Sequence, residues 1–158
     1  ESPMPWEAYE RRRIRYYDPY HDTLFSELLR LKKRFGYAIL LDAHSMPSRA
    51  TRLHSDPGAI RSDIVPGDLR GRSCGPWLTR ATREFWQRAG YSVAVNRPYQ
   101  GGGITRRHGH PENGVHAIQV ELNRRLYMNE ETLEPNGGFE QLAADCRAFV
   151  RDLASISL

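Results

Sequence analysis

The stretch VHAIQVEL, residues 115–122, indicates the fold class because it has the alternating pattern of a β-strand. Alternation divides its side chains between two faces, His116, Ile118 and Val120 on one and Ala117, Gln119 and Glu121 on the other. A carboxylate in a mostly apolar strand is costly to bury unless it is paired or used. Glu121 is therefore a candidate general base or acid. The alternative is an edge strand in which Glu121 faces water.

Helical and strand-like segments surround this stretch. Two further strands are expected at residues 37–41, ending before Asp42, and at residues 91–95. The interval from residue 44 to about residue 76 has no helical period and is expected to be a long functional loop. Helices are expected at residues 19–35, 77–89 and 139–156. This order predicts a single α/β domain, residues 1–158, with helices on both sides of a mixed sheet in a three-layer α/β/α arrangement.

The composition is that of a folded domain and argues against several classes of protein. The chain has 158 residues, of which 39% are hydrophobic and 27% charged, with a net charge of +4. Acidic residues are scattered among the arginines, so the continuous basic stripe of a nucleic-acid binder is missing. No apolar run approaches the roughly 20 residues that a membrane span needs. Cys74 and Cys146 are expected to be packed, reduced thiols, which predicts a cytoplasmic protein.

A first polar cluster, LDAHSMPS at residues 41–48, directly follows the predicted strand at residues 37–41. An imidazole at a strand end is a plausible metal ligand, and His44 has Asp42 close by to hold its second ring nitrogen. The alternative is a strand-end turn in which Asp42 and Ser45 cap backbone groups. The residues alone favour neither interpretation.

A second polar cluster is the glycine-rich segment NRPYQGGGITRRHG, residues 96–109. Three consecutive glycines let the backbone approach a ligand closely, and the arginines beyond them could bind a carboxylate. A mobile surface hairpin is the default interpretation. His108, His110 and His116 are also clustered, but their spacing fits no standard zinc motif, so we expect these histidines to be mostly solvated.

These motifs, taken together and in order, resemble the N-formylglutamate amidohydrolase family. The resemblance rests on DAHSMPS at residues 42–48, NRPYQGGGITR at residues 96–106, GVHAIQVELN at residues 114–123 and LYM at residues 126–128. It extends over about residues 12–130, since PYH at residues 19–21 also matches the approach to the family's first helix. That family is similar in fold to the zinc carboxypeptidases.

The resemblance implies a zinc site and a catalytic base. His44 matches the zinc ligand that follows a core strand, and Glu121 matches the general base. Asp42, Ser45 and His116 are expected to support these groups. The remaining metal ligands, a His and a Glu in the peptidases, come from an earlier part of the family's chain and are expected outside these residues. The chain is thus expected to be the carboxyl-terminal portion of an amidohydrolase domain.

The implied reaction is hydrolysis of N-formyl-L-glutamate to formate and L-glutamate, as in histidine degradation, with a small molecule as the only expected partner. Glu121 would take a proton from a zinc-bound water and pass it to the leaving amine. The substrate carries two carboxylates, for which Arg106 is the first predicted anchor and Arg97 or Arg107 the second, with Asn96 beside them. The alternatives are another zinc-dependent amidase or carboxypeptidase acting on acyl amino acids or peptides, and a non-catalytic arginine-rich binding module. The oligomeric state is not indicated.

Overall fold

The computed structural model describes residues 3–52 and 56–156, which divide into two compact units, Glu1–Ala38 and Ile39–Leu158. The first unit is helical. It contains α1 (Trp6–Arg12), a π-helical turn (Arg13–Tyr17) and α2 (Asp18–Phe35). The single domain predicted for residues 1–158 stays a prediction.

The sequence explains where α2 begins and ends. Pro19 occupies the first turn, where its missing N–H costs nothing. Basic residues lie in the last turn beside the negative end of the helix dipole, and Gly36 ends the helix with a left-handed φ of 86°. The predicted bounds of this helix are confirmed within one residue. The helical character of residues 6–17 was not predicted.

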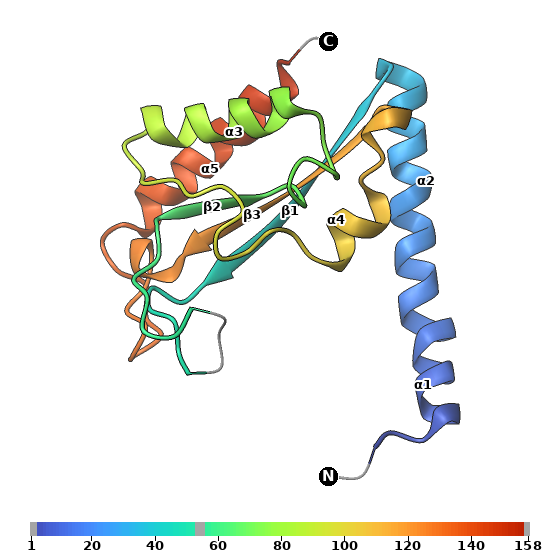
Figure 1. Ribbon diagram of the computed structural model, residues 1–158, viewed down its shortest axis with the longest axis horizontal. Helices are drawn as coiled ribbons and strands as arrows, with labels where there is room; N and C mark the ends of the chain where they lie inside the picture. The colour runs from blue at the N-terminus through green and yellow to red at the C-terminus, as the bar shows by residue number, and fades with distance from the viewer. Residues whose placement is uncertain (1–2, 53–55, 157–158) are drawn as a thin grey trace. The chain divides into compact units, whose positions relative to one another are not determined.

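The second unit is built on a three-stranded sheet of order β1-β3-β2. Its strands are β1 (Ala38–Met46), β2 (Ile64–Gly67) and β3 (Val115–Asn123). β2 pairs antiparallel with β3, with Val65 opposite Glu121. The arrows of β1 and β3 run the same way in Figure 1, so the sheet is mixed. The mixed α/β class is confirmed.

Two helices cover one face of this sheet. α3 (Pro76–Arg88) and α5 (Phe139–Ala154) lie side by side in Figure 1, and α3 packs on β2 and β3. Ile118 and Val120 of β3 join these helices in one core, in which Trp86 and Leu78 are fully buried. A short helix, α4 (Gly103–His108), packs against β3, and single turns of 3-10 helix flank that strand at Pro111–Asn113 and Arg124–Leu126.

Three predictions about the sheet were wrong. β1 extends to Met46, five residues beyond the predicted end, so Asp42 and His44 are strand residues. β2 lies inside the interval that was predicted to be a loop. The predicted strand at residues 91–95 makes only one parallel bridge, between Val93 and Ile64, because it meets the outer edge of the short strand β2.

Candidate active site

Glu121 lies on the face of β3 that does not contribute to the core. Only 6% of the residue is exposed, and Nε2 of Gln119 donates a hydrogen bond of 2.9 Å to its Oε1 atom. Burial raises the pKa of the Glu121 carboxyl above its ordinary value, and the negative charge of Asp42 adds to this effect. A buried carboxyl with a raised pKa and one remaining oxygen is suited to accept a proton from a reacting group.

His44 and Asp42 lie on β1, the strand next to β3. Nε2 of His44 donates to Oδ1 of Asp42 over 2.9 Å, which leaves Nδ1 outside this bond. The His44 side chain is 47% exposed and that of Asp42 13%. The second oxygen of Asp42, Oδ2, is buried and has no hydrogen-bond partner among the described residues.

The two strands bring these groups into one site. Two groups on β1 act electrostatically on Glu121: His44 lowers the pKa of its carboxyl, and the negative charge of Asp42 raises it. Charges influence one another's ionisation mainly over distances of about ten ångströms or less. Glu121 and His44, 77 positions apart by their sequence numbers, therefore belong to the same cluster of polar groups.

Two arginines that sequence reasoning did not select also act on Glu121, and both lower its pKa. Arg61 has a side chain only 1% exposed, and its guanidinium donates to Asp56, to the hydroxyl of Tyr99 and to the carbonyl of Pro47. Burial alone would lower the pKa of Arg61, but these hydrogen bonds and charges raise it. Arg124 is exposed and donates from Nε to Oγ of Ser45 over 3.3 Å.

The predicted substrate anchors are exposed residues in and beside the glycine-rich segment. Arg106 and Arg107 are exposed on α4, and Arg97 is exposed beside a cis peptide bond to Pro98. The groups that shift the pKa of Glu121 include Arg61 and Arg124 and none of these three arginines. Their role as anchors stays a prediction.

Asn96 has a clear structural task. Its Oδ1 accepts hydrogen bonds from the backbone N–H of Asp68 and of Arg70, and its Nδ2 donates to the Asp68 carboxylate over 2.7 Å. Both polar atoms of the Asn96 side chain thus form hydrogen bonds that stabilise the turn after β2. This geometry makes Asn96 a scaffold residue and weakens its predicted part in substrate binding.

His116, which was predicted to support the metal ligand, makes its contacts on the core side of the sheet. Its ring faces the other side of β3 from Glu121, where Nδ1 accepts a hydrogen bond of 3.1 Å from the backbone of Gly75 and the ring packs on Trp77 at 5.0 Å. Burial lowers the pKa of His116, so the ring is neutral near pH 7. His108 is buried as well, so the expectation that these histidines are mostly solvated is correct only for His110.

The glycine-rich segment is not a free hairpin. Gly103 begins α4, and the backbone of Gly101 lies against Gly67 of β2. The N–H of Leu69 donates to the carbonyl of Gln100 over 2.6 Å. Gly101, with its φ of 114°, and Gly102, whose added Cβ would come within 3.2 Å of Gln119, let this segment run close over the end of the sheet.

The cysteines are free thiols, as predicted. Burial raises the pKa of Cys74 to about 11, with a smaller contribution from the charge of Asp68. A thiol with such a pKa is almost fully protonated near pH 7 and is a poor nucleophile. Cys74 therefore belongs to the core and takes no part in the candidate site.

The candidate site contains one histidine with the environment typical of a metal ligand. His44 presents an imidazole whose other nitrogen is held by a carboxylate, the usual support of a metal-binding histidine. Residues 3–52 and 56–156 contain no cluster of three His, Cys, Asp or Glu side chains that could hold a metal ion. Within these two ranges His44 is therefore a candidate ligand, with no complete ligand set around it.

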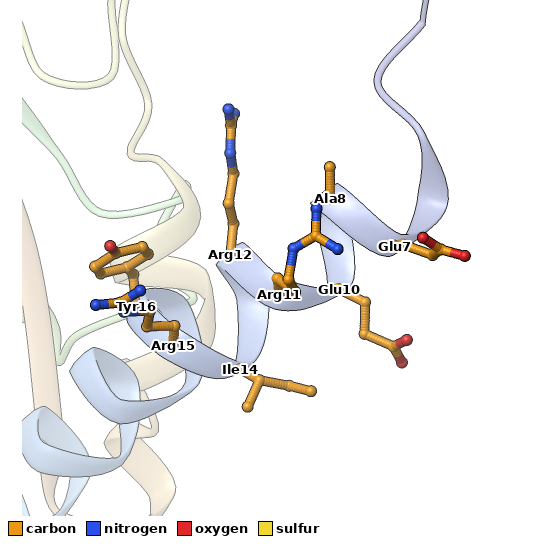
Figure 2. A pocket seen from close by; sticks show the side chains of 8 residues that line it. All are labelled: Glu7, Ala8, Glu10, Arg11, Arg12, Ile14, Arg15 and Tyr16. Carbon is orange, nitrogen blue, oxygen red and sulfur yellow. The ribbon is translucent and has the colours of Figure 1, made fainter.

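The helical first unit contains a hollow of about 670 Å³ (Figure 2). It contains none of the residues gathered around Glu121, and its side chains are those of one continuous helical segment. We therefore do not assign the chemistry to it. Its lining consists of Glu7, Ala8, Glu10, Arg11, Arg12, Ile14, Arg15 and Tyr16.

Fold and site together define an α/β protein in which two neighbouring strands, β1 and β3, carry the imidazole and carboxylate groups of the candidate site. The family model of N-formylglutamate amidohydrolase matches residues 1–128, and the chain belongs to this family. Within the described residues, no helix has both the length and the apolar character needed to cross a membrane.

Two curated relatives and one solved structure agree with this assignment. An N-formylglutamate deformylase of Pseudomonas aeruginosa is 41% identical over 146 residues, which are 89% of this chain and 53% of the relative. One of Pseudomonas putida is 40% identical over 91% of this chain and 53% of the relative. The crystal structure of N-formylglutamate amidohydrolase from Ralstonia eutropha JMP134 matches with a TM-score of 0.84 and 36% identity, covering 94% of this chain and 53% of that one. The chain thus spans about half the length of these proteins.

Proposed function

We propose that the protein hydrolyses the formyl amide of N-formyl-L-glutamate, releasing formate and L-glutamate. Family membership supports the reaction, and the relatives that match most of this chain are named for it. The observation that carries the proposal is the placement of Glu121 and His44 on neighbouring strands, close enough for His44 to influence the pKa of Glu121.

In the proposed reaction, Glu121 is the general base. Its ionised carboxylate accepts a proton from the attacking water while the water oxygen adds to the formyl carbon. The protonated Glu121 then donates this proton to the leaving amine as the C–N bond breaks. Gln119 donates a hydrogen bond to Oε1 of Glu121, so Oε2 is the oxygen that would accept the proton. The return of the proton converts the amine into a neutral leaving group, so one residue serves both steps.

A divalent ion such as zinc, bound through His44, would activate the water and polarise the formyl oxygen. Asp42 would hold the His44 ring through Nε2, so that Nδ1 is the ligand atom. We propose that the other ligands come from outside the residues of this chain. We also propose that a second helical layer completes the three-layer fold, and that the reaction takes place in the cytoplasm, which the free thiols of Cys74 and Cys146 support.

The test is release of the free amine, measured with an amine-reactive dye, by the full-length protein acting on a panel of N-formyl-L-glutamate, N-acetyl-L-glutamate, N-formyl-L-aspartate and short amino-blocked peptides. We expect a clear preference for N-formyl-L-glutamate, loss of activity with a chelator and its return with zinc. Preference for an uncharged peptide would instead assign the protein to a peptidase-like activity on the same fold.

A further inference from the structure

The side-chain amide of Gln119 lies between the candidate general base and the glycine-rich segment. Gln119 is on the same face of β3 as Glu121, since one strand residue separates the two positions. Its Nε2 atom donates to Oε1 of Glu121 over 2.9 Å, and the residue is buried. Its Oε1 atom lies 3.2 Å from the place that a Cβ atom of Gly102 would occupy. One amide thus lies against both the carboxylate and the backbone of the segment.

Hydrogen-bond chemistry determines which way this amide faces. An ionised carboxylate has only acceptor atoms, so the NH2 group of Gln119, and not its carbonyl oxygen, must face Glu121. The carbonyl oxygen then has to face Gly102, where a methyl group would press against it. The orientation of the amide therefore depends on free space at position 102.

Space, and not backbone conformation, requires glycine at position 102. The φ of Gly102 is −124° and its ψ is −154°, an extended conformation that alanine adopts without strain. Gly101 differs, because its φ of 114° lies in the region that favours glycine. A Cβ atom at Gly103 would meet nothing within 4 Å. Of these three glycines, Gly102 is therefore the one whose missing side chain is linked to Gln119.

The backbone of Gly102 is itself fixed by α4. Oγ1 of Thr105 accepts a hydrogen bond of 2.9 Å from the N–H of Gly102 and donates one of 3.1 Å to its carbonyl oxygen. Thr105 is fully buried, and α4 packs against β3. Gly102 therefore cannot move freely away from an added methyl group, and the group that would be displaced is the end of the Gln119 side chain.

We propose that Gln119 is a positioning residue for Glu121, and that position 102 is glycine because a side chain there would displace the Gln119 amide. The inference rests on the proposed function, since it takes Glu121 to be the general base. A carboxylate that is held by one oxygen presents the other in a constant direction, which proton transfer requires. The glycine-rich segment thus acts on the reaction through Gln119.

The first experiment observes this amide directly, and its result does not depend on activity. NMR of the nitrogen-15-labelled full-length protein records the side-chain NH2 signals, and those of Gln119 are identified by their loss in Q119M. We expect G102A to move these signals, because it alters the hydrogen bond to the Glu121 carboxylate, and G103A to leave them in place. Signals that stay in place in G102A, or that move equally in both glycine variants, would contradict the proposal.

The second experiment measures kcat and KM for N-formyl-L-glutamate with the same variants. Q119M should lower kcat about tenfold to a hundredfold, as for loss of a hydrogen bond to a charged group, and should change KM less than about twofold. G102A should lower kcat as well, and G103A should not. Added to Q119M, G102A should have little further effect, since the amide through which it acts is gone. A change in KM alone, or effects of Q119M and G102A that simply multiply, would overturn the proposal.

The two experiments separate this inference from the proposed function. If the unsubstituted protein releases no glutamate from N-formyl-L-glutamate, the proposed reaction fails, while the NMR comparison still decides whether Gly102 fixes the Gln119 amide. If the protein is active and G102A behaves as G103A does in both experiments, the reaction stands and the positioning role fails. The kinetic comparison of G102A with G103A holds even if Q119M does not fold.

Discussion

Gln119 and Glu121 are joined by a hydrogen bond of 2.9 Å on one face of β3, while Ile118 and Val120 on the opposite face pack into the core. One face of this strand thus packs in the core with residues of α3 and α5, and the other face presents the carboxylate of the candidate site. Substitutions on the two faces should separate stability from chemistry.

E121Q should lower turnover of N-formyl-L-glutamate about 10²–10⁴-fold, because an amide of the same size cannot accept the proton. Zinc content, measured by elemental analysis of the purified full-length protein, should not change, since Glu121 is assigned no ligand role. E140Q, a matched change at an exposed position of α5, should leave turnover unchanged. An E121Q variant with more than a tenth of normal activity would remove Glu121 from the role of base.

The same variant should be more stable than the unsubstituted protein at neutral pH when both are free of metal. Burial raises the pKa of Glu121 in the folded state, so ionisation of this carboxyl opposes folding as pH rises through that range. Below the pKa of a solvated glutamate both states bind the proton, and the penalty vanishes. Melting temperatures measured from pH 4 to pH 8 with a chelator present should therefore diverge with rising pH, E121Q being the higher.

A pair of curves that stays parallel over this range would contradict the raised pKa. The kinetic counterpart is an acidic limb of kcat/KM that lies at a pH above the ordinary pKa of glutamate, since the base must be ionised to act. E121Q should lose that limb together with its activity.

D42N should weaken metal binding about 10–100-fold, because the Asp42 carboxylate fixes the orientation of the His44 ring. Competition with a chromophoric chelator measures this affinity in the full-length protein. The residual activity at saturating zinc should show its acidic limb at lower pH, because Asp42 raises the pKa of Glu121. D152N on α5 is the control and should alter neither quantity. Unchanged zinc affinity in D42N would disconnect Asp42 from the metal.

Periodicity was sufficient to predict most helices and the central strand. α2, α3 and β3 begin and end within about one residue of the predicted bounds, because each has a clear apolar pattern and a terminating residue. β2 was not predicted because two of its four residues are Pro66 and Gly67, which are unusual inside strands. Strand pairing with β3 overrides this local preference.

The sequence allowed the prediction of contacts within one strand of the candidate site, but not of contacts between residues far apart in the chain. The hydrogen bond between Asp42 and His44 follows from their spacing on one strand face. Arg61 donates a hydrogen bond to the hydroxyl of Tyr99, 38 positions away. No local sequence pattern predicts such a long-range contact. Arg124 and Arg125 follow the strand that carries Glu121, and the sequence does not distinguish them. They differ only in their distant partners, Ser45 for Arg124 and Asp63 for Arg125.

G67A should destabilise the protein, because the glycine-rich segment lies directly on β2. A Cβ atom at residue 67 would come within 2.5 Å of the backbone nitrogen of Gly101 and 2.7 Å of the carbonyl carbon of Gln100. Backbone atoms cannot yield as the end of a side chain can, so we expect a loss of about 1–3 kcal/mol in the free energy of unfolding, measured with urea.

G103A is the matched control for this substitution. Gly103 is the first residue of α4, and an added Cβ would meet nothing within 4 Å. Alanine there should be neutral or stabilising by up to about 1 kcal/mol, since it restricts the unfolded chain and favours the helix. If G67A unfolded at the same urea concentration as G103A, the segment would not rest on β2, and its glycines would need another explanation.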